Sequence, residues 1–307
     1  MSQWFCVVGS INMDLVAQVD RFPRPGETRT GSSFGTYPGG KGANQAVALA
    51  RLGADVFMAG KIGDDVFGAS YLETFEAEGI HRDELEVVSG SSTGVAVIEV
   101  DETGENHIVI VPGANGLVDR GYVDAHLARI GAAGHVLFQL ETPFDTVEYG
   151  MARAAEQGAV TILDPAPAPP EGLSAQMLAH ARYITPNENE AEALTGVAVS
   201  DRDGASRAAA VLRERGADTV IIKAGAHGAY VTDADGTRHV PGFSVQVADT
   251  TAAGDAFNAG LAYALGGGRS LDEAVRFANA VGAVSCTGLG AQSAMPSRSA
   301  TEDLLDA

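Results

Sequence analysis

Short apolar runs alternate with segments of helical periodicity along most of the chain. The apolar runs predict strands at residues 5–10, 55–63, 135–140, 159–165, 183–187 and 218–225. Helical patterns follow or separate them at residues 42–53, 67–79, 143–157, 188–195 and 203–215. Strands that are apolar throughout are buried on both faces. The alternation therefore predicts an α/β fold, a doubly wound and mainly parallel sheet flanked by helices.

Two segments depart from this alternation. Residues 15–37 and 93–111 each have a strand–turn–strand pattern, and the second alternates with period two around "DETGEN", which is typical of a hairpin. Hairpins do not belong to a doubly wound core. They predict a small β-sheet inserted in it, either as a lid over the carboxyl edge of the main sheet or as an edge extension without function. With 307 residues and no linker, the chain is expected to form a single domain over 1–307.

The composition narrows the setting of the protein. Hydrophobic residues make up 45% of the chain, enough for a core, yet no apolar run is long enough to span a bilayer and no basic leader precedes the first strand. Cys6 and Cys286 lie far apart in the sequence and support neither a disulfide framework nor a cysteine metal site. We therefore expect a cytoplasmic protein with no membrane partner.

The charge is strongly negative. The net charge is −20, from 40 acidic and 20 basic residues, and the only lysines are Lys41, Lys61 and Lys223. Such a charge works against binding of nucleic acid or of anionic membranes. The acids are spread along helical segments, which fits either an ordinary acidic cytosolic protein or one adapted to high salt. The scarcity of lysine favours adaptation to high salt.

A glycine-rich motif, "PGGKGANQA", covers residues 38–46. Residues 35–41 match G-x-x-x-x-G-K, but Gly42 follows where a phosphate-binding P-loop needs Ser or Thr to hold magnesium. The glycines instead allow close approach of backbone to a ligand at a helix start. Lys41, Asn44 and the amides would suit sugar hydroxyls; the alternative is a tight turn into a helix.

Polar residues also follow the first strand, in "GSINMDLV". Ligands of open α/β sheets bind outside the carboxyl ends of the strands, where Asn12 and Asp14 would lie. An Asn–Asp pair can donate to and accept from neighbouring hydroxyls. The same pattern is common in turns, so by itself it leaves both interpretations open.

Two further segments are candidates for a nucleotide site. In "YITPNENEAEALTG", Asn187 and Glu190 have the spacing of a capping box, and the functional alternative is that they hold magnesium through water. In "IIKAGAHGAYV", Gly225 and Gly228 would let backbone and Lys223 face a nucleotide, unless the segment is an ordinary β-turn.

The segment "DTTAAGDAFNAG" carries the most specific chemistry. Ala252, Ala253 and Gly254 leave the amides of a helix start unshielded, and such amides attract negative charge. They would form an anion hole for a transferring phosphoryl group. Asp255 beside them would take the proton of an attacking hydroxyl. A role as a helix N-terminal charge would explain the acid but not the small residues before it.

Taken together, these segments resemble the ribokinase / phosphofructokinase-B family of carbohydrate kinases. The resemblance spans nearly the whole chain and includes "GSINMD", "PGGKGANQA", "DPAPA", "ITPNENEAE", "DTTAAGDAFNAG" and "GAQSAMP". It implies an α/β core with a β-sheet lid, ATP as phosphoryl donor, magnesium, and a homodimer formed through the lid. The implied reaction is phosphorylation of the primary 5-hydroxyl of D-ribose to give ribose 5-phosphate.

The resemblance also implies roles for individual residues. Asp255 would deprotonate the sugar hydroxyl, and Glu190 would act on magnesium. The implied sugar ligands are Asn12, Asp14, Gly40, Lys41, Asn44 and Glu141. The implied nucleotide site comprises Asn187, Lys223, Ala224, Gly225, Ala226, Gly228, Gly254 and Asn279.

An activating potassium ion is implied beneath the anion hole. Its ligands would be the Asp249 side chain and the backbone carbonyls of Thr251, Ser285, Gly288 and Gly290. The last ligand position of that loop usually holds a serine, whereas this chain has Ala294, so the completeness of the site is open. The family also often has Asn where this chain has Asp164.

The acceptor is not fixed by these motifs. Alternatives to ribose are another sugar, a nucleoside, or a sugar phosphate such as ribose 1-phosphate, whose phosphate Arg29 of the lid would face. An inactive sugar-binding regulator is a different class of protein. It would be expected to lack Asp255 or the small residues before it, and this chain has both.

Overall fold

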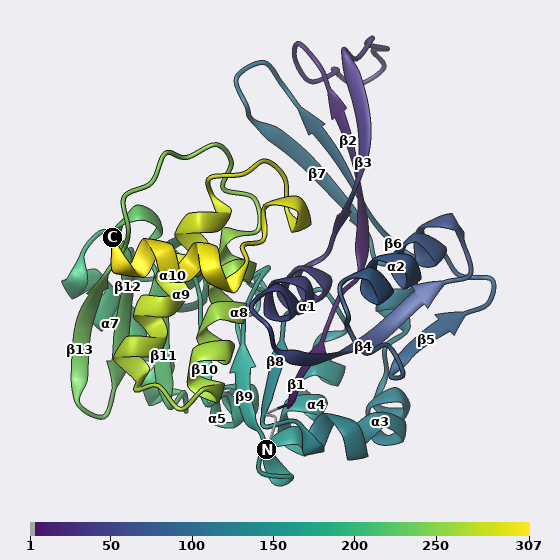
Figure 1. The fold of residues 1–307 in the computed structure, drawn as a ribbon. Coiled ribbons are helices and arrows are strands. Elements are labelled where there is room, and N and C mark those ends of the chain that lie inside the picture. Colours follow the sequence, from purple (N-terminus) through teal and green to yellow (C-terminus); the bar gives the residue numbers. More distant parts are fainter. Residues whose placement is uncertain (1–3) are drawn as a thin grey trace.

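The computed structural model describes residues 4–307 and contains a large sheet covered by helices on both faces (Figure 1). Within those residues the sheet has nine strands in the order β13-β12-β11-β10-β9-β8-β1-β4-β5. It is parallel from β11 to β5, whereas β12 and β13 run antiparallel at one edge. The strands are β1 Trp4–Val8, β4 Asp55–Gly63, β5 Leu85–Val88, β8 His135–Phe138, β9 Val160–Leu163, β10 Tyr183–Ile184, β11 Thr219–Lys223, β12 Gly228–Asp233 and β13 Gly236–Pro241.

Alternating side chains of the buried strands serve two separate cores. In β1, Phe5 and Val7 pack into one core while Cys6 and Val8 pack into the other. The first core is closed by α1 Lys41–Arg51, α2 Val66–Ala77, α8 Ala253–Gly266 and α9 Leu271–Ser285, with α10 Arg298–Asp306 packed on α9. The second is closed by α3 Arg120–Ala132, α4 Phe144–Glu156, α5 Ala175–His180, α6 Glu188–Thr195 and α7 Arg202–Glu214. The predicted doubly wound α/β fold is confirmed.

A second sheet projects from the body and forms the lid (Figure 1). It has the order β3-β2-β6-β7 and is built from β2 Asn12–Gln18, β3 Ser33–Gly39, β6 Gly94–Val100 and β7 Asn106–Val111. The two predicted hairpin segments thus pair with each other, through parallel strands β2 and β6. Because β2 begins only a few residues after β1 ends, the lid is tied directly to the carboxyl edge of the main sheet.

Candidate active site

A cleft of about 530 Å³ lies between the lid and the carboxyl ends of the central strands. Its walls include most of the residues that the sequence analysis identified as candidates. Those are Asn12, Asp14, Gly40, Lys41, Asn44, Glu141, Asn187, Glu190, Lys223, Gly225, Ala252, Ala253, Gly254 and Asp255. The lid contributes Ala96, Ile98, Ile108 and Ile110.

A second cavity, of about 600 Å³, adjoins the first. The two share Lys223, Gly225, Thr250, Ala253 and Gly254. Ala226, Gly228 and Asn279 line only the second one. Ala224 lines neither, since it is buried under the turn that follows β11 and donates its N–H to the Gly228 carbonyl.

The start of α8 forms the floor where both cavities meet. Ala252, the residue before the helix, has φ of 59° and is the one non-glycine residue with positive φ in residues 4–307. A left-handed alanine costs roughly 1–3 kcal/mol, and such strain is concentrated at functional sites. The Ala253 N–H donates to the Thr250 carbonyl at 3.2 Å, so this predicted anion-hole amide is already engaged within the turn.

Asp255 is the buried acid of this floor. Its Oδ2 accepts from Asn44 Nδ2 at 2.9 Å and its Oδ1 from Gln45 Nε2 at 3.1 Å. Burial raises the pKa of Asp255 to about 6, against the opposing charge of Lys41 and with a further increase from Asp164. The carboxylate is therefore held in a fixed orientation and is a stronger base than an exposed aspartate.

The ammonium of Lys41 balances the acids around the cleft. Burial disfavours its charge, but Asp255, Asp164 and Glu141 together outweigh this, and the pKa of Lys41 lies above its usual value. Burial, Glu141 and Asp255 raise the pKa of Asp14 to about 7. The cleft thus gathers several carboxylates near Lys41, an arrangement suited to binding hydroxyl groups.

Glu141 also lines the cleft and accepts hydrogen bonds from the segment after β1 and from the start of α1. Its Oε2 accepts from Ser10 Oγ at 2.5 Å, from Asn12 Nδ2 at 3.3 Å and from the Lys41 N–H at 3.2 Å. Gly40 makes this approach possible, because it has φ of 84° and a Cβ there would lie 2.5 Å from the Asn12 backbone nitrogen. The glycine-rich motif therefore brings α1 against the start of the lid.

Several polar residues that hold the site were not found from the sequence. Asn115 donates to Asn12 Oδ1 at 2.7 Å, which turns the Asn12 amide nitrogen toward Glu141. Gln292 donates to Asn44 Oδ1 at 3.2 Å. Gln45 lies inside the quoted "PGGKGANQA" motif, and only its distance from Asp255 along the chain concealed it.

Asn187 and Glu190 form the predicted capping box of α6. Glu190 N donates to Asn187 Oδ1 at 2.8 Å, and Asn187 N donates to Glu190 Oε2 at 2.7 Å. Both residues also face the cleft, so the cap does not remove them from the candidate site. The cap uses one oxygen of Glu190, and the other is suited to a water molecule on magnesium, which keeps most of its waters.

The segments predicted to hold potassium lie together behind α8. Asp249 Oδ1 accepts from the Thr251 N–H at 2.9 Å, and its Oδ2 accepts from the Gly290 N–H at 2.9 Å. Burial acts against the Asp249 carboxylate, but these hydrogen bonds outweigh it and lower the pKa. Ser293 Oγ donates to the Leu289 carbonyl at 2.6 Å, next to Ala294. Both oxygens of Asp249 therefore accept hydrogen bonds from the loops that were expected to supply the other potassium ligands.

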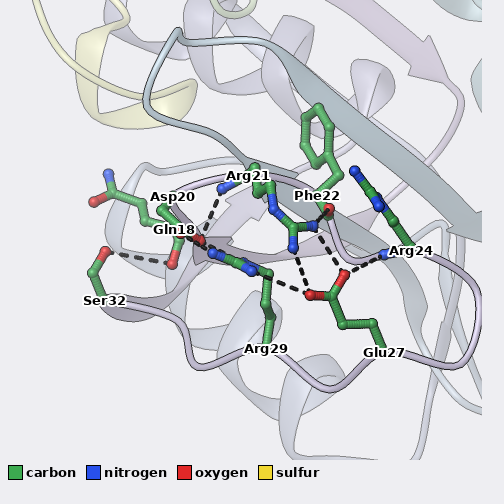
Figure 2. Close-up of polar contacts among 8 residues, drawn as sticks. All are labelled: Gln18, Asp20, Arg21, Phe22, Arg24, Glu27, Arg29 and Ser32. Atoms are coloured by element: carbon green, nitrogen blue, oxygen red, sulfur yellow. Dashed lines mark hydrogen bonds and ion pairs between the residues drawn. The ribbon is translucent and has the colours of Figure 1, made fainter.

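Arg29 lies away from the cleft, at the tip of the lid (Figure 2). Its guanidinium donates two hydrogen bonds to the two carboxylate oxygens of Asp20, and a third to Glu27 at 3.2 Å. Glu27 is shared with Arg21, at 2.6 Å. The idea that Arg29 faces a substrate phosphate is therefore wrong for this conformation, because its guanidinium is already paired with lid acids.

Comparison with known proteins agrees with this architecture. The model of the pfkB family carbohydrate kinases matches residues 3–298, and the chain belongs to this family. It is 44% identical to the ribokinase of Haemophilus influenzae over 306 residues, which is 100% of this chain and 99% of that protein. It is 35% identical to the deoxyribokinase of Salmonella typhi, covering 95% of each chain. The structure of Arabidopsis thaliana ribokinase complexed with ribose and ATP superposes with a TM-score of 0.94 at 32% identity, covering 100% of both chains.

Proposed function

We propose that this protein transfers the γ-phosphoryl group of ATP to the primary 5-hydroxyl of D-ribose, giving ribose 5-phosphate and ADP. The observation that carries this proposal is the position of Asp255, buried behind the strained turn at Ala252 and inside a cleft lined by hydroxyl-binding groups. Relatives named ribokinase, similar over their full length, support ribose as the acceptor and ATP as the donor.

In this proposal Asp255 accepts the proton of the 5-hydroxyl as the oxygen attacks the γ-phosphorus and the bond to ADP breaks. Amides of Ala252, Ala253 and Gly254 stabilise the charge on the phosphoryl oxygens, with Ala253 exchanging the Thr250 carbonyl for a phosphoryl oxygen. The sugar is held by Asn12, Asp14, Gly40, Lys41, Asn44 and Glu141. The nucleotide lies along Asn187, Lys223, Gly225, Ala226, Gly228, Gly254 and Asn279, which line the two cavities, while Ala224 supports the turn beneath it.

Magnesium, when bound, would neutralise charge on the triphosphate. Glu190 would hold it through water, since it lines the cleft beside Asn187 and Lys223. Burial raises the pKa of Glu190 while Lys223 opposes this, so a bound divalent cation would favour its ionised form.

A substrate panel tests the proposed reaction. The purified protein is incubated with ATP, magnesium and potassium chloride and with ribose, 2-deoxyribose, other sugars, nucleosides or ribose 1-phosphate, and the product is located by phosphorus NMR. Ribose phosphorylated at the 5-position with the highest kcat/KM is expected. Preference for a nucleoside or a sugar phosphate would replace ribose by that acceptor, and binding without any turnover would indicate an inactive regulator.

Wild-type protein should prefer ribose over 2-deoxyribose, and Asn12→Met should narrow the difference. Asn115 fixes the Asn12 amide so that its N–H group faces the cleft beside Glu141, where a missing hydroxyl would leave it unpaired. An unpaired buried donor costs roughly 1–3 kcal/mol. Asn106→Met, at an exposed lid position, is the matched control. Equal kcat/KM for the two sugars in the wild type would reject this role for Asn12.

We also propose a potassium site formed by Asp249 and the carbonyls of Thr251, Ser285, Gly288 and Gly290. Most of these ligands are backbone atoms, so Ala294 should weaken the site without removing it. Activity titrated with potassium chloride, at an ionic strength kept constant with a large organic cation, should rise and saturate. A flat titration would mean that potassium does not act at this loop.

We propose in addition that two chains associate through the outer face of the lid. The side chains that alternate with the cleft-facing ones include Phe34, Val97 and Val109, which are 68%, 42% and 63% exposed. Val97→Lys with Val109→Lys should halve the mass measured by light scattering. Val66→Lys, at a site on α2 that is 76% exposed, should leave it unchanged. A single-chain mass for the wild type would refute the dimer.

The proposed location is a salt-rich cytoplasm. The net charge of −20 and the free thiols of Cys6 and Cys286 support it. No helix in residues 4–307 is long and apolar enough to cross a membrane. Recovery of the native protein in the membrane or extracellular fraction of its source cells would contradict this location.

A further inference from the structure

Asp164 and Lys223 form a buried ion pair in the floor of the cleft. Asp164 directly follows β9 and Lys223 ends β11, and the distance from Lys223 Nζ to Asp164 Oδ1 is 2.9 Å. Their side chains are 3% and 12% exposed. Removing two charges from water carries a desolvation cost that a buried pair often fails to recover, so stability alone does not account for this pair.

The pair is connected to the candidate catalytic base through one amide. Gln45 Nε2 donates to Asp164 Oδ2 at 3.2 Å and to Asp255 Oδ1 at 3.1 Å. Gln139 Nε2 donates to Gln45 Oε1 at 2.7 Å, which fixes the Gln45 amide with its nitrogen toward both carboxylates. The orientation of Asp255 therefore depends on a chain of hydrogen bonds that begins at Lys223 and passes through Asp164.

Lys223 also lies beside the proposed phosphate position. A Cβ placed on Gly254 would be only 3.3 Å from Lys223 Nζ, so the ammonium is next to the anion-hole turn. Lys223 and Gly254 both line the cleft and the adjoining cavity. The Lys223 ammonium thus lies between the expected triphosphate site and the Asp164 carboxylate. Asp164 is in turn connected to Asp255 through Gln45.

We propose that Asp164 and Lys223 act as one positioning unit. Asp164 holds the Lys223 ammonium beside the incoming phosphate and away from Asp255. Gln45, which donates to both Asp164 and Asp255, keeps the Asp255 carboxylate in its orientation. This inference rests on the proposed function of Asp255 and the anion hole. It predicts that loss of the Asp164 charge alone releases Lys223 toward the remaining carboxylates, Asp255 and Glu190, and impairs the base.

The charged groups that line the cleft together with Asp255 come from several elements. They include Lys41 of α1, Asp14 of β2, Asp164 after β9, Glu141 after β8, Glu190 of α6 and Lys223 of β11. Asp164 is among those that raise the pKa of Asp255. Removing its charge should therefore move the acidic limb of the kcat/KM profile to lower pH, a change that a merely structural role would not produce.

A double-mutant cycle of Asp164→Asn and Lys223→Gln tests the unit. Asp164→Asn should lower kcat by roughly tenfold with the KM for ribose nearly unchanged, and Lys223→Gln should also lower kcat. Adding Lys223→Gln to Asp164→Asn should then raise kcat, because the misplaced ammonium is gone. A double variant whose loss equals the product of the single losses would overturn the proposal.

Three controls keep the result interpretable. Lys61 and Glu86, another pair at 2.9 Å but outside the cleft, should tolerate Lys61→Gln and Glu86→Gln with kcat nearly unchanged. Thermal melting checks that each variant folds, and Lys223→Arg, which keeps the charge, should retain more activity than Lys223→Gln.

Calorimetric titration with ADP separates failure of this inference from failure of the proposed reaction, because it needs no sugar turnover. Lys223→Gln should raise the Kd for ADP in the wild-type protein and in the Asp164→Asn variant. The two fold-increases in Kd should differ from each other by at least about threefold. The same factor in both backgrounds would show that the two residues act independently, whatever acceptor the enzyme uses.

Discussion

Asp255→Asn should abolish sugar phosphorylation while ribose and ATP still bind. Asp255 is the buried carboxylate at the anion-hole turn, and Asn44 and Gln45 already donate to its two oxygens. Asparagine keeps the shape but cannot accept the proton of the attacking hydroxyl. Loss of general-base assistance lowers kcat by roughly 10²–10⁴-fold. Steady-state kinetics with ribose and calorimetric binding of ribose and ADP measure the two halves of this prediction.

The control for this variant is Asp203→Asn, an exposed acid on α7 that does not line the cleft. It changes the formal charge by the same amount and should leave kcat unchanged. Near-wild-type turnover in Asp255→Asn would remove Asp255 from the mechanism. Loss of turnover together with loss of both ligands would instead show that the variant disrupts the cleft.

The buried core of the fold was predictable from the sequence for a physical reason. Central parallel strands such as β4 and β8 are buried and mostly apolar, and each is followed by a turn and a helical pattern. The edge strands β5 and β13 were not predicted. Their residues are mostly half-exposed or exposed, so neither a continuous apolar run nor a clean alternation marks them. The local sequence pattern also could not predict that the two lid hairpins pair with each other, because this pairing joins strands far apart in the chain.

The candidate site could likewise be predicted only in part from the sequence. Residues inside compact motifs, such as Lys41, Asn44 and Asp255, could be located because glycine and helix-start chemistry surrounds them. The role of Asn115 and the pairing of Lys223 with Asp164 could not be predicted. Their contacts connect segments far apart in the chain: Asn115 to Asn12, and Asp164 to Lys223 and Gln45. Such contacts are set by how the strands lie side by side, which no single motif contains.

The capping box of Asn187 and Glu190 shows a different limit of the sequence. Cap and metal site appeared there as alternatives, yet in the structure the same two residues form the cap and line the cleft. A helix start is stabilised by polar side chains and also presents them to a ligand. Local chemistry therefore identified the residues but could not separate the two roles.

The melting temperature should rise steeply with salt, by more than about 5 °C between roughly 0.1 M and 3 M potassium chloride. The Debye length is roughly 30 Å at 0.01 M salt and falls to roughly 3 Å at 1 M, so surface carboxylates repel one another across the domain only at low salt. Within residues 4–307, the ion pairs involve fewer than half of the 40 acidic side chains. Local pairing with arginine therefore leaves most of the repulsion uncompensated.

Summed over many carboxylates, even weak repulsion matters, because net stability is typically about 5–15 kcal/mol. Salt also strengthens apolar burial, and a less acidic ribokinase melted over the same series corrects for that contribution. A weakly salting-out chloride should reproduce most of the rise if screening is its cause. If the ordinary enzyme gains as much as this protein, the negative surface does not set the salt dependence, and adaptation to a salt-rich cytoplasm is refuted.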